Sequence, residues 1–101
     1  MRTLPADIEW LSASEGGRQH PPIGPSYRAP VRFGPWSGSQ PEEATFTFIV
    51  ELVDSSDAYH WRANVTFEVA GAPEEVFVPG ATFELYEGRR CVARGRVFGA
   101  N

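Results

Sequence analysis

The sequence predicts a single all-β domain, and three observations support this prediction. The chain has 101 residues, which is the size of one ordinary domain. Ten Gly and nine Pro interrupt it, and such residues favour short strands and turns over long helices. Several runs alternate between apolar and polar residues, which is the period of a strand with one buried face. About six such strands can be counted, a number that suits a closed antiparallel barrel or a small sandwich.

Two strands and a structured loop are expected in the first third of the chain. Residues 1–5 are expected to form a flexible N-terminus, and residues 8–13 a short strand. Residues 14–25 contain a glycine pair, which permits positive φ, and a proline pair, which excludes a helix. A second strand is expected over residues 27–33, so this loop connects two strands.

The clearest strand patterns lie in the middle of the chain. Residues 44–53 and 60–69 alternate strictly and are expected to pair as a hairpin. Residues 54–57 have the composition of a turn, so the connection is expected to span about six residues, longer than the two-residue optimum. The side chains expected to point into the core are Phe46, Phe48, Val50, Leu52, Trp61, Ala63, Val65, Phe67 and Val69.

Two further strands are expected in the last third. Residues 76–78 form a brief extended piece that ends in a turn at Pro79-Gly80. Residues 83–86 and 90–98 then alternate again, on either side of a turn at residues 87–89. One face of the last strand is expected to carry Cys91, Ala93, Gly95 and Val97, and the other Arg90, Val92, Arg94, Arg96 and Phe98.

The charge of the chain disfavours non-specific binding to nucleic acid. The formal net charge is −4, and all nine basic residues are Arg. Residues 1–41 carry a charge of +1, residues 42–87 carry −9 and residues 88–101 carry +4. Neutralising phosphates requires clustered cations, and only the two ends of the chain have a surplus of them.

Composition also limits the compartment and the chemistry. The sequence has no run of 18 apolar residues, so no membrane span is expected, and no apolar run near its start, so no secretory signal is expected. Cys91 is the only cysteine and cannot form an internal disulfide, which is typical of a reducing, cytoplasmic compartment. Together with His20 and His60 it lacks the spacing of metal ligands, so we expect no metal site and a buried structural thiol.

Two stretches at opposite ends of the chain match one known family. Residues 8–21 read Ile-Glu-Trp-Leu-Ser-Ala-Ser-Glu-Gly-Gly-Arg-Gln-His-Pro, and Tyr27-Arg28 follows. Residues 83–97 read Phe-Glu-Leu-Tyr-Glu-Gly-Arg-Arg-Cys-Val-Ala-Arg-Gly-Arg-Val. The first stretch resembles the opening strand and Glu-Gly-Gly-Arg loop of the C-terminal β-barrel of elongation factor Tu, and the second resembles its closing hairpin. The resemblance implies one six-stranded antiparallel closed barrel over residues 1–101.

The chain departs from that family at several positions. Gln19 and His20 stand where the family usually has His and Thr, and Arg89 replaces the second Gly of the closing turn. Residues 34–80 match poorly. A Gly-x-x-x-x-Gly-Lys-[Ser/Thr] phosphate loop is absent from the sequence, which has no Lys. We therefore expect a stand-alone barrel that binds no nucleotide or other cofactor and is not an enzyme.

The resemblance implies a binding function. The leading expectation is a module that acts through a protein partner, for example by competing with or mimicking elongation factor Tu toward a toxin or a translation component, as a monomer or weak homo-oligomer. The alternative is an RNA- or tRNA-binding accessory protein, because the family barrel contacts tRNA. The residues that would converge on RNA are Arg18, Arg28, Arg89, Arg90, Arg94 and Arg96.

Two roles are open for the glycine-rich loop. By the resemblance, Gly16, Gly17 and Arg18 lie where the family contacts tRNA and would meet a partner. In the other role the glycines only form the turn, and Arg18 braces a loop carbonyl or Glu15. Gly88 is expected to form the turn between the last two strands.

Two roles are also open for the arginines of the last strand. Arg90, Arg94 and Arg96 share one face at a period of two, beside Arg89, and would form an anion-binding stripe. They would otherwise pair across strands with Glu84 and with acids of residues 42–75.

Trp36 is a further candidate, because it stands in a loop of Gly, Pro and Ser. It would either anchor a partner or pack over an open barrel end. The adjacent carboxylates at residues 42–43 and 74–75 lie next to prolines and are expected to be solvated loop charges.

Overall fold

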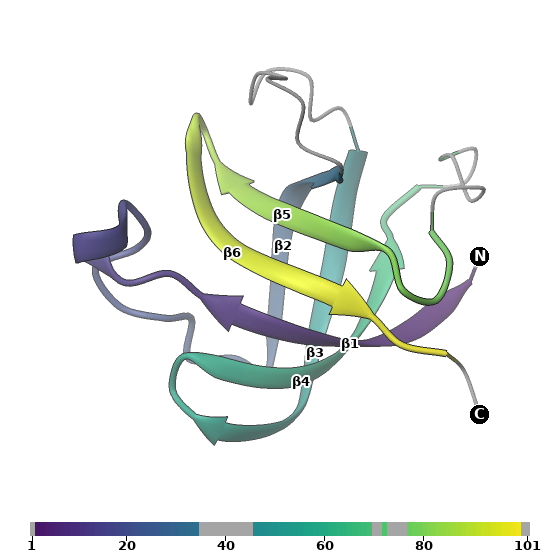
Figure 1. The fold of residues 1–101 in the computed structure, drawn as a ribbon, viewed down its shortest axis with the longest axis horizontal. Coiled ribbons are helices and arrows are strands. Elements are labelled where there is room, and N and C mark those ends of the chain that lie inside the picture. The colour runs from purple at the N-terminus through teal and green to yellow at the C-terminus, as the bar shows by residue number, and fades with distance from the viewer. Residues whose placement is uncertain (1, 35–45, 70–71, 73–76, 100–101) are drawn as a thin grey trace.

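Six strands form the fold of this protein, which is described here from a computed structural model covering residues 2–34, 46–69, 72 and 77–99 (Figure 1). The strands are β1 (Thr3–Trp10), β2 (Ser26–Phe33), β3 (Phe46–Asp57), β4 (His60–Phe67), β5 (Thr82–Glu87) and β6 (Arg90–Val97). One turn of 3-10 helix, η1 (Ala13–Glu15), follows β1. Within these described ranges there is no α-helix.

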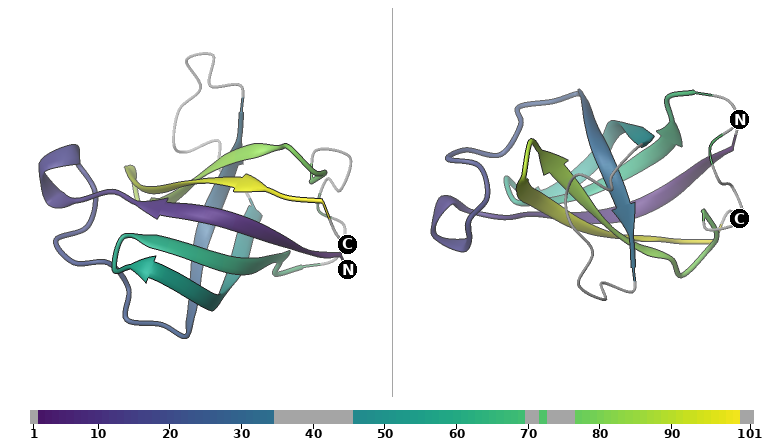
Figure 2. Two further views of the ribbon diagram at one scale, coloured as in Figure 1. Left: turned by 60° about the horizontal axis from the view of Figure 1, so that its bottom comes forward. Right: turned by 90° about the horizontal axis from the view of Figure 1, so that it is seen from above.

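The strands close into a barrel in the order β1-β4-β3-β2-β5-β6, with β6 pairing back onto β1. Every pair is antiparallel. Ile8 of β1 lies opposite Trp61 of β4 on one side and Gly95 of β6 on the other. Two further views show the sheet curving round on itself (Figure 2). The prediction of an all-β, six-stranded antiparallel closed barrel is therefore confirmed.

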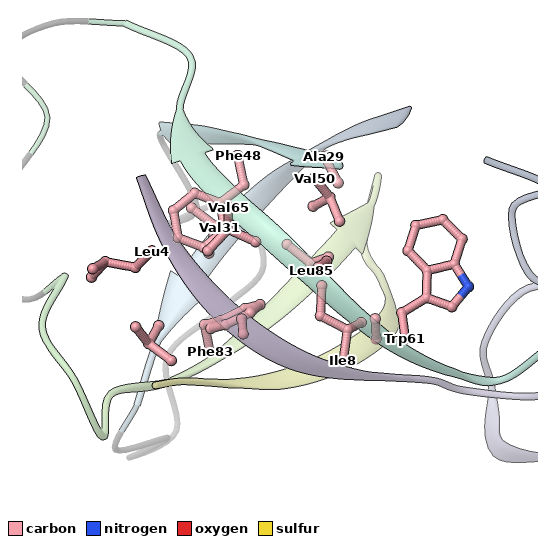
Figure 3. Packing of buried hydrophobic residues seen from close by; sticks show 14 of the residues in the cluster. Leu4, Ile8, Ala29, Val31, Phe48, Val50, Trp61, Val65, Phe83 and Leu85 are labelled. Atoms are coloured by element: carbon pink, nitrogen blue, oxygen red, sulfur yellow. The ribbon is translucent and has the colours of Figure 1, made fainter. Parts of the chain in front are cut away.

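The core lies inside the barrel and is built from alternate residues of each strand (Figure 3). The buried side chains that the strands contribute include Leu4, Ala6, Ile8, Trp10, Ala29, Val31, Phe48, Val50, Trp61, Ala63, Val65, Phe67, Phe83, Leu85, Ala93 and Val97. Alternation in the β3 and β4 sequences predicted their inward residues correctly up to Phe67. Val69 is an exception, because it follows the end of β4 and is half exposed.

Aromatic rings occupy both ends of the core. At one end Trp10 packs edge-on against Tyr27 and Trp61, with ring centroids 5.2 Å and 5.0 Å away. At the other end Phe33, Phe48, Phe67, Phe77 and Phe83 pack together. Such ring pairs add roughly 0.5–1.5 kcal/mol each beyond the apolar area they bury. The tryptophan end supports the loop between β1 and β2.

Strand β1 begins earlier than the sequence predicts. Residues 3–5, which were expected to belong to a flexible N-terminus, pair with β4, and Leu4 is buried. Leu4 and Ala6 extend the apolar face of β1 toward the N-terminus from Ile8, where the strand was expected to begin, and the strand ends at Trp10 instead of residue 13. The sequence did not predict this extension because it contains Pro5, and Pro is normally a poor strand residue.

The β3–β4 hairpin is longer and tighter than expected. Strand β3 continues to Asp57, so only Ala58 and Tyr59 separate the strands, instead of a loop of about six residues. Register shifts occur between Leu52 and Asp54 and again between Ser55 and Asp57. Each bulge inserts an extra residue and interrupts the alternation. The residues in this part of the strand are also polar, and this is why the sequence predicted a turn here.

A third bulge changes which face Cys91 occupies. Leu85 lies opposite Ala93, but Tyr86 lies opposite Cys91, so Val92 is the additional residue. Val92 points inward and is fully buried, whereas Cys91 is only partly buried. The prediction that Cys91 shares the apolar face of Ala93 is therefore wrong, because the bulge shifts the alternation by one residue.

The expected extended piece at residues 76–78 is not a strand where it is described. Phe77 lies outside the sheet, yet its side chain is fully buried against the phenylalanine end of the core. The guanidinium of Arg2 donates a hydrogen bond of 2.8 Å to the Phe77 carbonyl. Residue 76 lies outside the described part of the chain.

Candidate functional site

Each strand carries charged residues of a single sign, if histidine is left aside. The acidic strands are β1 with Asp7 and Glu9, β3 with Glu51, Asp54 and Asp57, and β5 with Glu84 and Glu87. The basic strands are β2 with Arg28 and Arg32, β4 with Arg62, and β6 with Arg90, Arg94 and Arg96. The barrel order alternates acidic and basic strands all the way round. Every strand therefore has two neighbours of opposite charge.

The register turns this alternation into rows of facing charges. One row joins one residue from each strand, in the order Arg32, Glu84, Arg94, Glu9, His60 and Asp57. A second row joins Asp54, Arg62, Asp7 and Arg96. Opposite charges that face each other across strands each stabilise a sheet by roughly 0.2–1 kcal/mol.

The predicted arginine stripe of β6 therefore lies between acids. Arg94 faces Glu84 of β5 and Glu9 of β1, and its Nε lies 3.5 Å from the Glu84 carboxylate. Arg96 faces Asp7 of β1. This favours cross-strand pairing over an anion-binding stripe. Glu84 of β5 is the partner that was expected, but the other acids come from β1 and not from residues 42–75.

Of the remaining candidate arginines, Arg18 and Arg90 both lie near Glu87, whereas Arg28 pairs elsewhere. Arg28 donates to the Glu68 carboxylate at 2.6 Å. Arg90 reaches the Gly17 carbonyl at 3.5 Å. Arg89 lies in the two-residue turn before β6, beside Gly88, whose φ is +60°. Trp36 lies outside the described residues.

Glu84 is a buried carboxylate on the outer face of the barrel. Its side chain accepts a hydrogen bond of 2.8 Å from Tyr86 and lies 3.4 Å from Arg32. Burial, and then the hydrogen bond to Glu84, raise the pKa of Tyr86 to about 12. Burial, and then the negative charge of Glu84, raise the pKa of Cys91 to about 11. This thiol therefore stays protonated at neutral pH.

The loop between β1 and β2 is fixed at its start by its two glycines. Gly16 ends η1 with φ +87°, a conformation that favours glycine. A Cβ on Gly17 would lie only 2.7 Å from the Leu11 Cβ and closer still to the Leu11 carbonyl. Glu15 closes the turn by accepting from the Ser12 amide at 2.9 Å. These contacts support the structural role of the glycine pair.

A side-chain network then ties this loop to the β5–β6 hairpin. Arg18 forms an ion pair with Glu87, and the Tyr27 hydroxyl donates to the same carboxylate. The Nε of Arg18 donates to the His20 carbonyl at 2.8 Å. Arg18 thus braces a loop carbonyl, as the structural alternative predicts, but its acidic partner is Glu87 and not Glu15.

Titration of the network has a direction that can be tested. Burial acts to raise the pKa of Glu87, but the hydrogen bonds from Tyr27 and Arg18 outweigh it and leave this pKa lowered. A lowered folded-state pKa stabilises the fold above the unfolded value of 4.5, and this contribution is lost as the pH falls through the folded pKa.

We expect Glu87→Gln to lower the free energy of unfolding at pH 7 by about 0.5–1 kcal/mol, an amount reduced by partial exposure of the pair. At pH 3 the difference from wild type should shrink, because the stabilisation from the ionised carboxylate declines below the unfolded pKa of 4.5 and as the pH falls through the lowered folded pKa. Urea unfolding at the two pH values measures both numbers. An equal loss at pH 3 and pH 7 would show that the charge of Glu87 is not the cause.

The braced loop presents an exposed apolar side chain, which the sequence prediction did not single out. Ile23 is 97% exposed. The backbone beside it is seated on the barrel, because the Leu52 amide donates to the Pro25 carbonyl at 2.8 Å. A Cβ on Gly24 would lie 3.3 Å from Leu52 and 3.6 Å from Trp61. The sequence feature that could have indicated this exposed side chain is an isoleucine surrounded by Pro and Gly.

Val53 is a second exposed aliphatic side chain near this loop. It is the additional residue of the bulge between Leu52 and Asp54, and it is 59% exposed. The Leu52 amide donates to the Pro25 carbonyl, so the loop enters β2 beside the residue that precedes Val53. The bulge thus presents a second aliphatic side chain next to the loop of Ile23.

An open groove of about 670 Å³ crosses the outer face of β6, β1, β4 and the end of β3. Residues from both rows of facing charges line it, including Asp7, Arg62, Arg94 and Arg96. Since acids and arginines alternate there, the groove does not offer a field of one sign to a charged ligand.

Neither the search for a membrane span or metal cluster nor the comparison with known proteins assigns a function to the barrel. In the described ranges no helix has the length and apolar character needed to cross a membrane. Across the same ranges, no three His, Cys, Asp or Glu side chains are grouped as metal ligands. No protein-family model and no curated protein matches the chain.

Proposed function

We propose that this protein is a non-catalytic binding module that acts through a protein partner. The observation that supports the proposal is the presentation of Ile23, which is 97% exposed on a loop whose flanks are fixed to the barrel. A loop held at both flanks loses less conformational entropy on binding than a free one, which improves affinity. An exposed aliphatic side chain on such a loop is suited to insertion into a pocket of another protein.

The chain resembles a stand-alone C-terminal barrel of elongation factor Tu, and we propose a cytoplasmic partner of the kind that meets that factor, such as a toxin or a translation component. The six-stranded antiparallel closed barrel is consistent with this. RNA is a less suitable partner, because Arg18, Arg28 and Arg94 each face a carboxylate. Phosphate binding would have to displace those pairs.

Affinity capture from an extract of the source cells tests the proposal. The immobilised wild-type chain is compared with Ile23→Ser and with Val78→Ser, a matched control that also removes an exposed aliphatic side chain. Both positions are exposed, so each substitution should change stability by less than about 0.5 kcal/mol. We expect a protein that wild type and Val78→Ser retain and Ile23→Ser loses, whether or not nuclease is present.

Two outcomes would contradict a protein-binding function that depends on this loop. Material that nuclease removes from the wild-type chain would indicate a nucleic acid partner. Retention of the same proteins by all three chains would show that Ile23 takes no part in binding.

A further inference from the structure

We infer that the partner segment is basic and carries an aliphatic side chain, and that it docks on Ile23 and Val53 between two carboxylates. This inference rests on the proposed function and specifies its chemistry. We call Ile23 and Val53 the apolar patch, and Glu51 and Asp54 the acidic rim. All four side chains are exposed.

The acidic rim consists of one carboxylate that faces no arginine and one whose facing arginine is bonded to a different acid. Glu51 lies between two uncharged residues, Ser26 of β2 and Asn64 of β4. Asp54 faces Arg62, but the Nε of Arg62 donates to Asp7 at 2.9 Å. Among the described residues, neither rim carboxylate has an ion-pair partner.

One residue of the patch, Val53, is adjacent in sequence to the rim residue Asp54. Val53 stands between Leu52 and Asp54, so the exposed aliphatic side chain and the carboxylate are neighbours. The Asp54 carboxylate accepts from the Ser55 amide at 2.8 Å, which holds it in place beside the bulge. A ligand that covers Val53 must therefore come close to negative charge.

Charge complementarity selects the occupant. An aliphatic side chain covers the apolar patch, and Arg or Lys residues on either side of it pair with Glu51 and Asp54, which steers association as well as orientation. RNA is repelled by the same carboxylates. A second copy of this chain is a poor occupant, because Arg94 and Arg96 of β6 already face acids of β1.

Titration of the ¹⁵N-labelled full chain with synthetic peptides tests the inference by NMR. The probe is the peptide acetyl-Arg-Ala-Arg-Leu-Arg-Ala-Arg-amide. One control peptide replaces Leu by Ser, and another replaces every Arg by Glu. We expect shifts of the amides of residues 23–24 and 51–55 with the probe, at least fivefold weaker binding of the Ser peptide, and no shifts with the Glu peptide.

Variants of the chain assign the two contributions. Ile23→Ser should weaken binding of the probe peptide at least fivefold at any salt concentration. The double variant Glu51→Gln/Asp54→Asn should weaken this binding by a similar factor and make it less dependent on salt. Val78→Ser should bind as wild type does.

Several results would overturn the inference. Equal binding of the Leu and Ser peptides would overturn it, as would binding of the Glu peptide. Amide shifts centred elsewhere on the barrel would do the same, and so would self-association of the chain through the apolar patch at high protein concentration. The capture experiment separates this failure from that of the proposed function. A partner lost by Ile23→Ser, together with a negative peptide titration, would leave the proposed function standing and reject only the basic chemistry.

Discussion

Gly95→Ala is expected to destabilise the barrel by about 3 kcal/mol or to prevent folding, which is the upper range for overpacking a core. A Cβ at residue 95 would lie 2.6 Å and 2.8 Å from the Cε2 and Cε1 atoms of Phe83. The Phe83 ring cannot easily retreat, because it is fully buried and packs 5.2 Å from Phe48. Urea unfolding, monitored by tryptophan fluorescence, measures the loss of stability.

Two further variants keep this prediction testable even if Gly95→Ala does not fold. Gly99→Ala is the matched control, because its new Cβ would come no closer than 3.9 Å to Pro79, and it should be neutral. Phe83→Leu/Gly95→Ala should be more stable than Gly95→Ala alone, because the smaller side chain makes room for the methyl group. A single Gly95→Ala variant with wild-type stability would contradict the packing described here.

Glu84→Ala is expected to lower the free energy of unfolding by about 3 kcal/mol, as is typical when one partner of a buried ion pair is removed. Glu84 is 7% exposed, and it lies 3.4 Å from Arg32 and accepts from Tyr86. Its loss leaves a largely buried guanidinium without this carboxylate and a buried hydroxyl without its acceptor. Thermal and urea unfolding at pH 7 measure the effect.

Glu84→Gln and Glu9→Gln are the comparisons for this prediction. The glutamine at residue 84 retains an acceptor for Tyr86, so its loss should be smaller than that of alanine. Glu9 belongs to the same row of charges but is exposed, and Glu9→Gln should cost less than about 1 kcal/mol. Equal losses for Glu84→Ala and Glu9→Gln would show that burial of the Glu84 charge is not important.

Much of the fold could be predicted because alternation is a local property of the sequence. Strands β3 and β4 display it clearly, and their inward residues follow from it. The prediction failed where a bulge shifted the alternation, as at Cys91, or where strand residues were polar, as at residues 54–57. A bulge depends on the partner strand, and a single sequence does not reveal it.

The candidate site was less predictable, because its contacts join residues far apart in the chain. Arg18 and Glu87 are 69 residues apart, and nothing in either segment identifies the other. The charge pattern is partly local, since odd-numbered strands are acidic and even-numbered strands are basic. That pattern favours pairing of odd with even strands and opposes pairing of like strands, but it does not choose among the odd–even orders.

Alternation of charge between whole strands, and not a set of separate ion pairs, places the arginines of this barrel. Exchanging the partners of one pair, in Asp7→Arg/Arg62→Asp, distinguishes these two explanations. The exchange keeps the net charge and the pair itself, but it sets a new arginine on β1 opposite Arg96 and a new aspartate on β4 opposite Asp54. Arg62 also stacks over the Phe98 ring at 4.7 Å, a contact that salt weakens much less.

Urea unfolding of wild type and of this double variant, at low salt and in 1 M NaCl, is the decisive comparison, where ~1 M reduces the screening length to a few ångströms. Strand alternation predicts that the double variant loses about 1–2 kcal/mol at low salt, because two facing charge pairs become repulsive. It also predicts that much of this loss disappears at high salt. If the double variant matches wild type at low salt, or loses equally under both conditions, alternation between strands does not place the arginines.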